Sequence, residues 1–256
     1  MKLLGGGRAG QIWRDGNTVI RPAGAWTPTV HRFLRHLRSR GFPGAPDPIE
    51  ITGNQEVVSY VSGRVCEDLS DQFVGSERML LSAAKLLSDF HSASQGFLEV
   101  DREVQTWMLP PQEPRQIICH GDYAPYNVAT AGHAVVGIID FDTAHPAPRL
   151  WDLAYSVYRW APLSDPANPH VTFSLNEQLR RAELFCTAYG ATKEERLQLP
   201  EMICWRLQAL VDFMLASAAA GDETFVEDVV AGDARLYLSD MDYVRSHRDR
   251  LLKALC

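Results

Sequence analysis

The chain has 256 residues, of which 46% are hydrophobic and 22% charged, and its net charge is −7. These values are typical of a globular protein built as one large domain or as two lobes. Its five cysteines are scattered and form no C-x-x-C pair, so they indicate neither a zinc ribbon nor a disulfide framework and favour a reducing, intracellular location. The first residues, MKLLGGG, are too short for a signal-peptide core, and no uncharged apolar run approaches the ~18 residues that cross a bilayer. We therefore expect a cytoplasmic protein.

The charge is unevenly distributed along the chain. Residues 1–64 hold nine Lys and Arg against four Asp and Glu, a balance of +5, so the remainder carries −12. Four arginines cluster within residues 32–40, which suits either a nucleic-acid-binding stripe or a solvated helix face. The second explanation is favoured, and the acidic remainder suits a cationic small molecule. We expect a small-molecule partner, no nucleic acid and no membrane.

The chain begins with a glycine pattern, Gly5-x-Gly7-x-x-Gly10. Alone, this pattern fits a dinucleotide-binding turn, a kinase-type phosphate loop or a purely structural turn. A dinucleotide-binding turn must open a helix, whereas residues 11–21 predict two short strands around the D-G turn at 15–16. The glycines are therefore predicted to lie in a strand–loop–strand, which favours the phosphate loop, with a structural turn as the alternative.

Residues 27–41 predict an amphipathic helix, with Thr27 as N-cap, Pro28 in the first turn and Gly41 at the stop. Residues 46–63 predict two strands around a G-N turn. Together with the first two strands, these elements predict a small α+β unit over residues 1–63. A linker-like segment follows at residues 61–70, with Gly63 as a hinge.

Residues 64–256 predict a larger, mainly helical unit. A helix capped by Ser76 comes first, and an apolar strand at 135–139 runs directly into carboxylates. Later helices are predicted after a capping box formed by Ser174 and Glu177, over residues 200–221 and over residues 241–255.

Residues 119–127, CHGDYAPYN, carry the first chemical signal. Glycine and proline within this stretch predict a loop rather than a helix face. His120, Asp122 and Asn127 follow H-x-D-x-x-x-x-N, the spacing of a kinase catalytic loop. The alternative is a polar turn in which Asp122 and Asn127 act as turn formers.

A second signal follows 13 residues after Asn127, where the apolar strand ends in Asp140, Phe141 and Asp142. This D-F-D segment stands where a kinase has D-F-G. Phosphoryl transfer needs one carboxylate to orient the attacking hydroxyl and accept its proton. It also needs an amide oxygen and a second carboxylate to hold Mg²⁺ against the phosphates.

With these motifs and RLWDLAY at residues 149–155, the sequence resembles the aminoglycoside phosphotransferase family of small-molecule kinases. The resemblance implies a two-lobed, protein-kinase-like α+β fold with a small β-rich N-lobe, residues 1–63, and a larger helical C-lobe, residues 64–256. It implies ATP and Mg²⁺ as cofactors, Asp122 as catalytic base, and Asn127 and Asp140 as metal ligands. His120 and Asp152 are implied to brace the loop.

The resemblance also assigns the nucleotide site. It implies that Gly5, Gly7 and Gly10 cover the phosphates and that Arg21 contacts them. The segment VVSYVSG corresponds to the hinge strand, with the backbones of Ser59 and Val61 as adenine contacts. The sequence is also similar to bacterial proteins labelled as immunity factors for the peptide antibiotic trifolitoxin.

The sequence departs from the family at Arg21, which takes the place of a lysine that is usually paired with a helix glutamate. Arginine presents a longer and flatter donor than an ammonium group. No acidic residue occurs between Asp15 and Asp47, so the following helix cannot supply a glutamate, and His31 is its nearest polar candidate. Either Arg21 needs no partner, or the nucleotide is held differently, or the protein binds without catalysis.

Other polar residues have competing interpretations. Asp212 stands alone among apolar neighbours on a helix, and a carboxylate on a buried helix usually has a partner, so Asp212 is a candidate for binding a cationic substrate. Asp142 is a second candidate. His91 is predicted to be a core histidine, and His133 and His145 are weak candidates for a metal site. Four aromatic residues at near-helical spacing suit a core or a substrate-stacking wall: Trp151, Tyr155, Tyr158 and Trp160.

The leading hypothesis is an ATP- and Mg²⁺-dependent phosphotransferase. It moves the γ-phosphoryl group to a hydroxyl of a small polar acceptor that carries a positive charge in some cases, such as an aminoglycoside-like antibiotic or a metabolite. The alternative is a catalytically silent nucleotide-binding or peptide-antibiotic immunity protein on the same fold. A metal-dependent hydrolase is a third, more distant interpretation.

Overall fold

The computed structural model describes residues 1–4, 12–66, 74–165, 168 and 173–256. Its contacts divide the chain into two compact units. Unit 1 comprises Met1–Asp68 and Lys85–Asp152, and unit 2 comprises Leu69–Ala84 and Leu153–Cys256. Each unit thus takes two separate segments of the sequence, and the division into lobes at residue 63 stays a prediction.

Unit 1 begins with a five-stranded antiparallel sheet in the order β1-β2-β3-β5-β4. The strands are β1 (Lys2–Leu4), β2 (Ile12–Asp15), β3 (Thr18–Pro22), β4 (Pro48–Thr52) and β5 (Gln55–Ser59). The two hairpins turn at Gly16 and Gly53, whose φ angles of 58° and 60° lie in the left-handed region that glycine adopts most easily. Both predicted turns are confirmed, and the register places Arg21 directly opposite Glu56.

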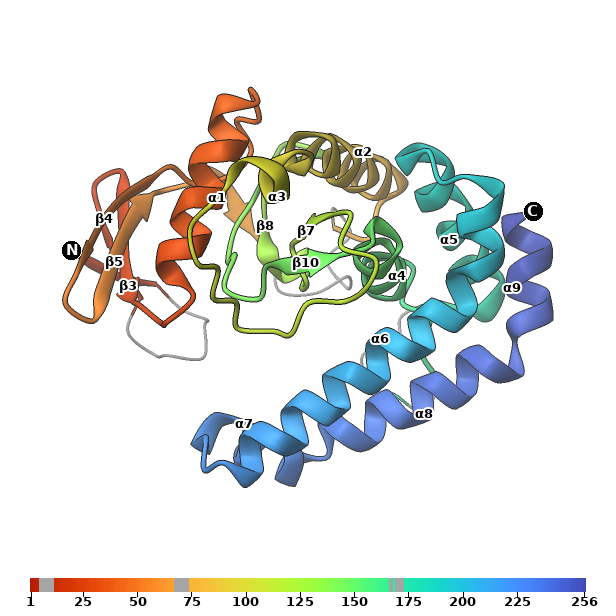
Figure 1. Ribbon diagram of the computed structural model, residues 1–256. Helices are drawn as coiled ribbons and strands as arrows, with labels where there is room; N and C mark the ends of the chain where they lie inside the picture. The colour runs from red at the N-terminus through yellow and green to blue at the C-terminus, as the bar shows by residue number, and fades with distance from the viewer. Residues whose placement is uncertain (5–11, 67–73, 166–167, 169–172) are drawn as a thin grey trace. The chain divides into compact units, whose positions relative to one another are not determined.

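Helix α1 (Thr27–Ser39) lies beside these strands (Figure 1). Its predicted apolar stripe is buried and consists of Val30, Phe33, Leu34 and Leu37. Burial of each such side chain stabilises the fold by about 2 kcal/mol. The stop at Gly41, with φ of 78°, is confirmed. The predicted N-cap is wrong, because Thr27 Oγ1 accepts a hydrogen bond from the Gly24 N–H of the preceding loop.

The rest of unit 1 carries the catalytic-loop region. Strands β6 (Arg64–Val65), β8 (Val128–Ala131) and β9 (Ala134–Ile138) form a three-stranded sheet, and β7 (Ile117–Cys119) pairs with β10 (His145–Ala147). Residues 64–65, predicted to be a linker, therefore pair with β8 instead. Gly63 is closely packed, since a Cβ atom there would lie 2.9 Å from Ala129 Cβ.

An aromatic cluster forms the core of unit 1. Phe141 lies edge-on to His120, with ring centroids 4.9 Å apart, and also contacts Phe33 and Phe90. Phe90 lies on α2 (Glu77–Ser94), and Phe33 also contacts Phe97 of the short helix α3 (Phe97–Val100). The residue between Asp140 and Asp142 is thereby fixed by side chains from two helices.

Unit 2 is helical. Its elements are the first part of α2, most of α4 (Arg149–Trp160), then α5 (Leu175–Tyr189), α6 (Lys193–Ala219), α7 (Glu223–Ala231), α8 (Asp233–Ser246) and α9 (Arg248–Leu255). The predicted caps at Ser76 and Ser174 are confirmed, because each hydroxyl accepts a backbone N–H. The Glu177 carboxylate, however, pairs with Arg180.

Two helix predictions in unit 2 are wrong. The single helix expected over residues 241–255 is the end of α8 followed by α9, with a break at His247. The helix expected from residue 200 starts at Lys193, where Thr192 and Glu195 form a reciprocal capping box. By length and composition α6 could cross a membrane, but it packs against α8, and core helices of globular proteins meet the same criterion.

Candidate active site

The catalytic-loop motif begins where β7 ends. Gly121 has φ of 83°, and a Cβ atom there would lie only 2.4 Å from the Thr143 carbonyl oxygen. Both the backbone angle and the close contact require glycine. The loop then closes in a short 3₁₀ helix, Pro125–Asn127, which turns the chain into β8.

The Asp152 carboxylate holds this loop through hydrogen bonds to its backbone. Its Oδ2 accepts the His120 N–H at 2.7 Å, and its Oδ1 accepts the Gly121 N–H at 3.0 Å. Oδ2 also lies 3.0 Å from His91 Nε2. Burial alone would raise the pKa of Asp152, but the hydrogen bonds from His91 and from the His120 N–H help to outweigh it and lower the pKa to about 2. These contacts have the geometry of the brace that the family resemblance implies.

His91, Cys119 and Asp152 form a buried group whose potential ligand atoms lie within 4.8 Å of one another. The Asp152 oxygens already accept N–H donors from the loop and from His91. We therefore assign this group to the brace rather than to a metal. His91 is buried, as a core histidine should be.

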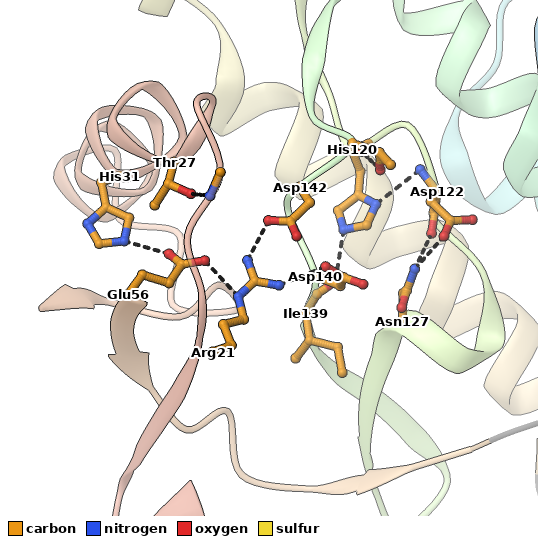
Figure 2. A network of polar contacts seen from close by, with 12 residues as sticks. Arg21, Thr27, His31, Glu56, His120, Asp122, Asn127, Ile139, Asp140 and Asp142 are labelled. Atoms are coloured by element: carbon orange, nitrogen blue, oxygen red, sulfur yellow. Dashed lines mark hydrogen bonds and ion pairs between the residues drawn. The ribbon is translucent and has the colours of Figure 1, made fainter. Parts of the chain in front are cut away.

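His120 connects the loop to the D-F-D segment. Its Nδ1 accepts the Asp122 N–H at 3.2 Å, so the ring proton lies on Nε2, which donates to the Ile139 carbonyl at 2.9 Å. The Thr143 hydroxyl donates to the His120 carbonyl at 3.0 Å. His120 thus holds a residue on each side of Asp140, Ile139 through its imidazole and Thr143 through its backbone carbonyl. Figure 2 shows the contact with Ile139.

The Asp122 carboxylate is held by two donors from its own loop. Asn127 Nδ2 donates to Oδ2 at 2.8 Å, and the Tyr126 hydroxyl donates to Oδ1 at 2.7 Å. Because the amide nitrogen of Asn127 faces Asp122, its Oδ1 points the other way. Tyr126 was not predicted as a site residue, although its place four residues after Asp122 in a tight loop is a usable signal.

Strand pairing brings Asp140 next to Asn127. Val128 pairs with Ile138, and the Ile139 N–H donates to the Asn127 carbonyl at 3.0 Å. Asp140 has φ of 64°, a left-handed conformation in which no other non-glycine residue of the described segments is found. Such a conformation is strained and occurs most often where a side chain must be aimed at a functional site.

Arg21 lies among three carboxylates, as Figure 2 shows. Its Nε donates to Glu56 at 2.7 Å, Nη1 to Asp140 at 2.8 Å and Nη2 to Asp142 at 2.7 Å. Burial alone would lower the pKa of Arg21, but the charges of Asp142, Asp140 and Glu56 raise it above its ordinary value. Burial raises the pKa of Asp142 to about 6 even though Arg21 opposes this change.

Arg21 therefore has an acidic partner, Glu56, which the sequence analysis did not identify. Glu56 is only 1% exposed and comes from β5, the strand next to Arg21, rather than from helix α1. Its second oxygen lies 2.7 Å from His31 Nε2. Arg21 and Glu56 belong to different hairpins, β2–β3 and β4–β5, so only the pairing of β3 with β5 brings them side by side.

The other predicted nucleotide contacts are placed as follows. The Ser59 N–H donates to the Asp47 carbonyl at 2.8 Å. Val61 packs on β9, where a Cβ atom at Gly137 would lie 2.3 Å from Val61 Cγ1. The three glycines of the predicted phosphate loop, Gly5, Gly7 and Gly10, lie outside the described residues.

The predicted substrate carboxylates are not alike. Asp142 lies within the Arg21 cluster of unit 1. Asp212 belongs to unit 2, where it is exposed and accepts a hydrogen bond from Gln208, one turn earlier on α6. The assumption that Asp212 is buried is therefore wrong, because Asp212 lies on an exposed side of α6.

The remaining predicted residues have structural surroundings. His145 is buried and its Nδ1 lies 2.7 Å from the Thr143 carbonyl, whereas His133 is exposed at the tip of the β8–β9 hairpin. Within the described segments they belong to no group of potential metal ligands. The aromatic residues predicted as core are all buried: Trp151, Tyr155, Tyr158 and Trp160.

The donor set near Asp140 suits magnesium. Mg²⁺ prefers oxygen ligands, often one or two carboxylates together with phosphate oxygens. Asn127 supplies an amide oxygen and Asp140 a carboxylate that is 43% exposed, with Asp142 two residues further on. The residues present therefore fit the metal that the family resemblance implies.

These elements define a class of protein. An antiparallel sheet with one helix is followed by a braced H-x-D-x-x-x-x-N loop and a strained D-F-D segment, which is the order of a protein-kinase-like fold. A choline/ethanolamine kinase family protein from Mesorhizobium loti shares this fold, with a TM-score of 0.63 and 16% identity over 99% of this chain and 91% of that protein. An amicoumacin kinase solved with AMP-PNP, Ca²⁺ and Ami has a TM-score of 0.61 and 10% identity over 86% of this chain and 87% of its own. The predicted α+β, protein-kinase-like fold class is confirmed.

Sequence comparisons are more specific. A sequence model of the APH family, described as "Phosphotransferase enzyme family", matches residues 98–194, the segment that contains both motifs. The trifolitoxin immunity protein of Rhizobium leguminosarum bv. trifolii is 28% identical, over 76% of this chain and 75% of its own. The predicted resemblance to the aminoglycoside phosphotransferase family and to immunity-labelled relatives is confirmed.

Proposed function

We propose that this protein is an ATP- and Mg²⁺-dependent phosphotransferase that moves the γ-phosphoryl group to a hydroxyl of a small acceptor. The observation that carries the proposal is the arrangement of the Asp122 loop against Asp140, with Asn127 hydrogen-bonded to both segments. A polar turn would need neither a buried brace at Asp152 nor a left-handed aspartate at Asp140.

In this proposal Asp122 orients the acceptor hydroxyl and accepts its proton, because a carboxylate held by two donors is fixed in direction. Asn127 Oδ1 and Asp140 would hold Mg²⁺, with Asp142 close by. The bound metal would neutralise charge that develops on the phosphates. Arg21 contributes a fixed positive charge for the phosphates, and His120 and Asp152 keep the loop in place.

The rest of the nucleotide site follows the family resemblance. The backbones of Ser59 and Val61 contact the adenine, and Gly5, Gly7 and Gly10 cover the phosphates. Residues 1–63 act as the N-lobe and residues 64–256 as the C-lobe, in a cytoplasmic protein.

We propose a small polar acceptor, with a cationic one favoured by the acidic composition of residues 65–256. The names of the solved relatives include a choline/ethanolamine kinase family and an amicoumacin kinase, both of which suggest such acceptors. Asp212, as an exposed carboxylate on α6, is a candidate for acceptor binding. Asp142 is better suited to the nucleotide side, because Arg21 already pairs with it.

The test is acceptor-dependent ADP release from Mg·ATP, measured against a panel of aminoglycosides, amino alcohols and peptide antibiotics. Asp122→Asn should lose turnover while its affinity for Mg·AMP-PNP stays unchanged. Asp140→Ala should remove the magnesium dependence of nucleotide binding. Equal turnover in wild type and Asp122→Asn, with an acceptor present, would refute the mechanism.

A catalytically silent immunity protein is the second candidate, and the similarity to the trifolitoxin immunity protein favours it. Such a protein would bind Mg·ATP or a peptide antibiotic without transferring phosphate. Nucleotide binding together with no phosphorylated product from any acceptor would favour this candidate over the kinase.

A further inference from the structure

The Glu56 carboxylate links two side chains that lie far apart in the sequence. Oε1 accepts the Arg21 Nε–H at 2.7 Å, and Oε2 lies 2.7 Å from His31 Nε2. Glu56 and His31 are each 1% exposed. Figure 2 shows the three side chains in a row, with α1 at one end and the D-F-D segment at the other.

The chemistry of the row fixes the direction of its hydrogen bonds. A carboxylate paired with a guanidinium is ionised and can only accept, so His31 Nε2 carries the proton and donates to Glu56. His31 Nδ1 has no hydrogen-bond partner in the part of the chain that the structure describes. The link to Glu56 is therefore the polar contact that orients this imidazole.

The two halves of the row are held by different means. Arg21 and Glu56 are cross-strand neighbours in β3 and β5, so the sheet fixes their backbones. His31 lies on α1, which also contacts Phe141 through Phe33. Helix α1 thus reaches the charged cluster through the histidine and the D-F-D segment through the phenylalanine.

Loss of the His31 donor would change the Arg21 side chain. A buried carboxylate oxygen without a donor is costly, and the nearest compensation is a second bond from the Arg21 guanidinium. Rotation of the guanidinium toward Glu56 would draw Nη1 and Nη2 away from Asp140 and Asp142, where they now donate. The direction of Arg21 therefore depends on His31.

We propose that His31 is a positioning residue for nucleotide phosphates, acting through Glu56 on Arg21. This inference rests on the proposed function and deepens it. In the kinases that this sequence resembles, a helix glutamate pairs with the phosphate-binding lysine. Here the helix contributes His31 instead, and the acidic partner of Arg21 is Glu56 on the neighbouring strand β5. His31 should then control affinity for the phosphates of a nucleotide but not for its adenosine part.

The test compares His31→Leu, which removes the donor, with His31→Gln, which restores one at a similar position. Isothermal titration would measure affinity for Mg·AMP-PNP and for adenosine. We expect His31→Leu to weaken Mg·AMP-PNP by about tenfold, the effect of one hydrogen bond to a charged group, and to leave adenosine unchanged. His31→Gln should recover most of the loss. Equal Mg·AMP-PNP affinity in wild type and His31→Leu would overturn the proposal, as would equal loss for adenosine.

His36→Gln is the matched control, because His36 lies on the same helix and its Nε2 contacts the Gln95 carbonyl outside the row. It should bind Mg·AMP-PNP like wild type. Equal weakening by His36→Gln would overturn the proposal, because any change in α1 would then lower the affinity for Mg·AMP-PNP. If His31→Leu does not fold, shown by its melting curve, His31→Met takes its place with a flexible side chain that fills the same space.

A second measurement separates this inference from the proposed function. The Arg21 Nε–H group, bonded to Glu56, should give a slowly exchanging NMR signal without any nucleotide, and this signal should shift in His31→Leu but not in His36→Gln. A wild-type protein that binds no nucleotide would refute the proposed function. An Arg21 signal unchanged by His31→Leu would refute the claim that His31 acts on Arg21 through Glu56.

Discussion

The Tyr126 hydroxyl donates a 2.7 Å hydrogen bond to Asp122 Oδ1. Asn127 donates to the other oxygen of the same carboxylate, so two residues of its own loop hold Asp122. Tyr126 is only half-buried, so a substitution there leaves no cavity in the core.

Tyr126→Phe should lower kcat by about tenfold while the KM for ATP changes little. The variant keeps the ring and loses one hydrogen bond to an ionised group, a change of about 1.4 kcal/mol in the transition state. Asp122 would keep its bond to Asn127, so activity should fall rather than vanish. Steady-state kinetics with a saturating acceptor would measure the change. An unchanged kcat would mean that the Tyr126 hydroxyl is not needed to orient the carboxylate.

Gly121→Ala should destabilise unit 1 by about 3 kcal/mol or more, because a Cβ atom would meet the Thr143 carbonyl at 2.4 Å. The matched control is Gly132→Ala, at a similar positive φ but with nothing within 4 Å of its Cβ position. The control should cost about 1 kcal/mol, the strain of a left-handed alanine. Urea unfolding of both variants gives the comparison, and equal losses would show that the close contact relaxes.

Asp152 should make stability depend on acid pH. Its pKa is lowered from 3.8 to about 2 in the folded protein, so its contribution is fully present above pH 4 and is lost as the pH falls through 2. The contribution is on the order of 2 kcal/mol. The difference in unfolding free energy between wild type and Asp152→Asn should therefore shrink between pH 4 and pH 2. A difference that stays constant over this range would mean that Asp152 titrates normally.

Two adjacent arginines of α5 should differ in their effect on stability. Arg181 is 1% exposed and donates to the Trp160 and Gly75 carbonyls, and burial lowers its pKa to about 10. Arg181→Met would leave both acceptors unsatisfied and should cost about 2–3 kcal/mol. Arg180 is 48% exposed, so Arg180→Met should cost less than about 1 kcal/mol despite its ion pairs with Glu77 and Glu177. Thermal melting of the two variants tests this ranking, and equal costs would contradict it.

Local sequence alone determined the hairpin turns, the buried face of α1 and the positions of the two motifs. The hairpin turns at Gly16 and Gly53 were predictable because positive φ is a property of single residues. The buried face of α1 was predictable because helical spacing determines which side chains share a face. The loop at residues 119–127 and the segment beginning at Asp140 were identified by short motifs, and strand pairing does bring them together.

Helix ends and breaks were less predictable. Thr27 suits an N-cap by residue type, but its hydroxyl accepts from Gly24 in the loop before the helix. The break at His247 follows no strong local signal, since neither glycine nor proline stands there. Residue preferences at these points are worth about 1 kcal/mol, which packing can override.

Only the tertiary structure gave Arg21 its partners. Glu56, Asp140 and Asp142 come from three separate segments, and no spacing in the sequence announces that they meet around one guanidinium. The pairing of β3 with β5 brings Glu56 to Arg21, and His31 joins them from α1. A buried carboxylate must find its donors wherever the fold places them, so its partners depend on strand register and helix packing rather than on neighbours along the chain.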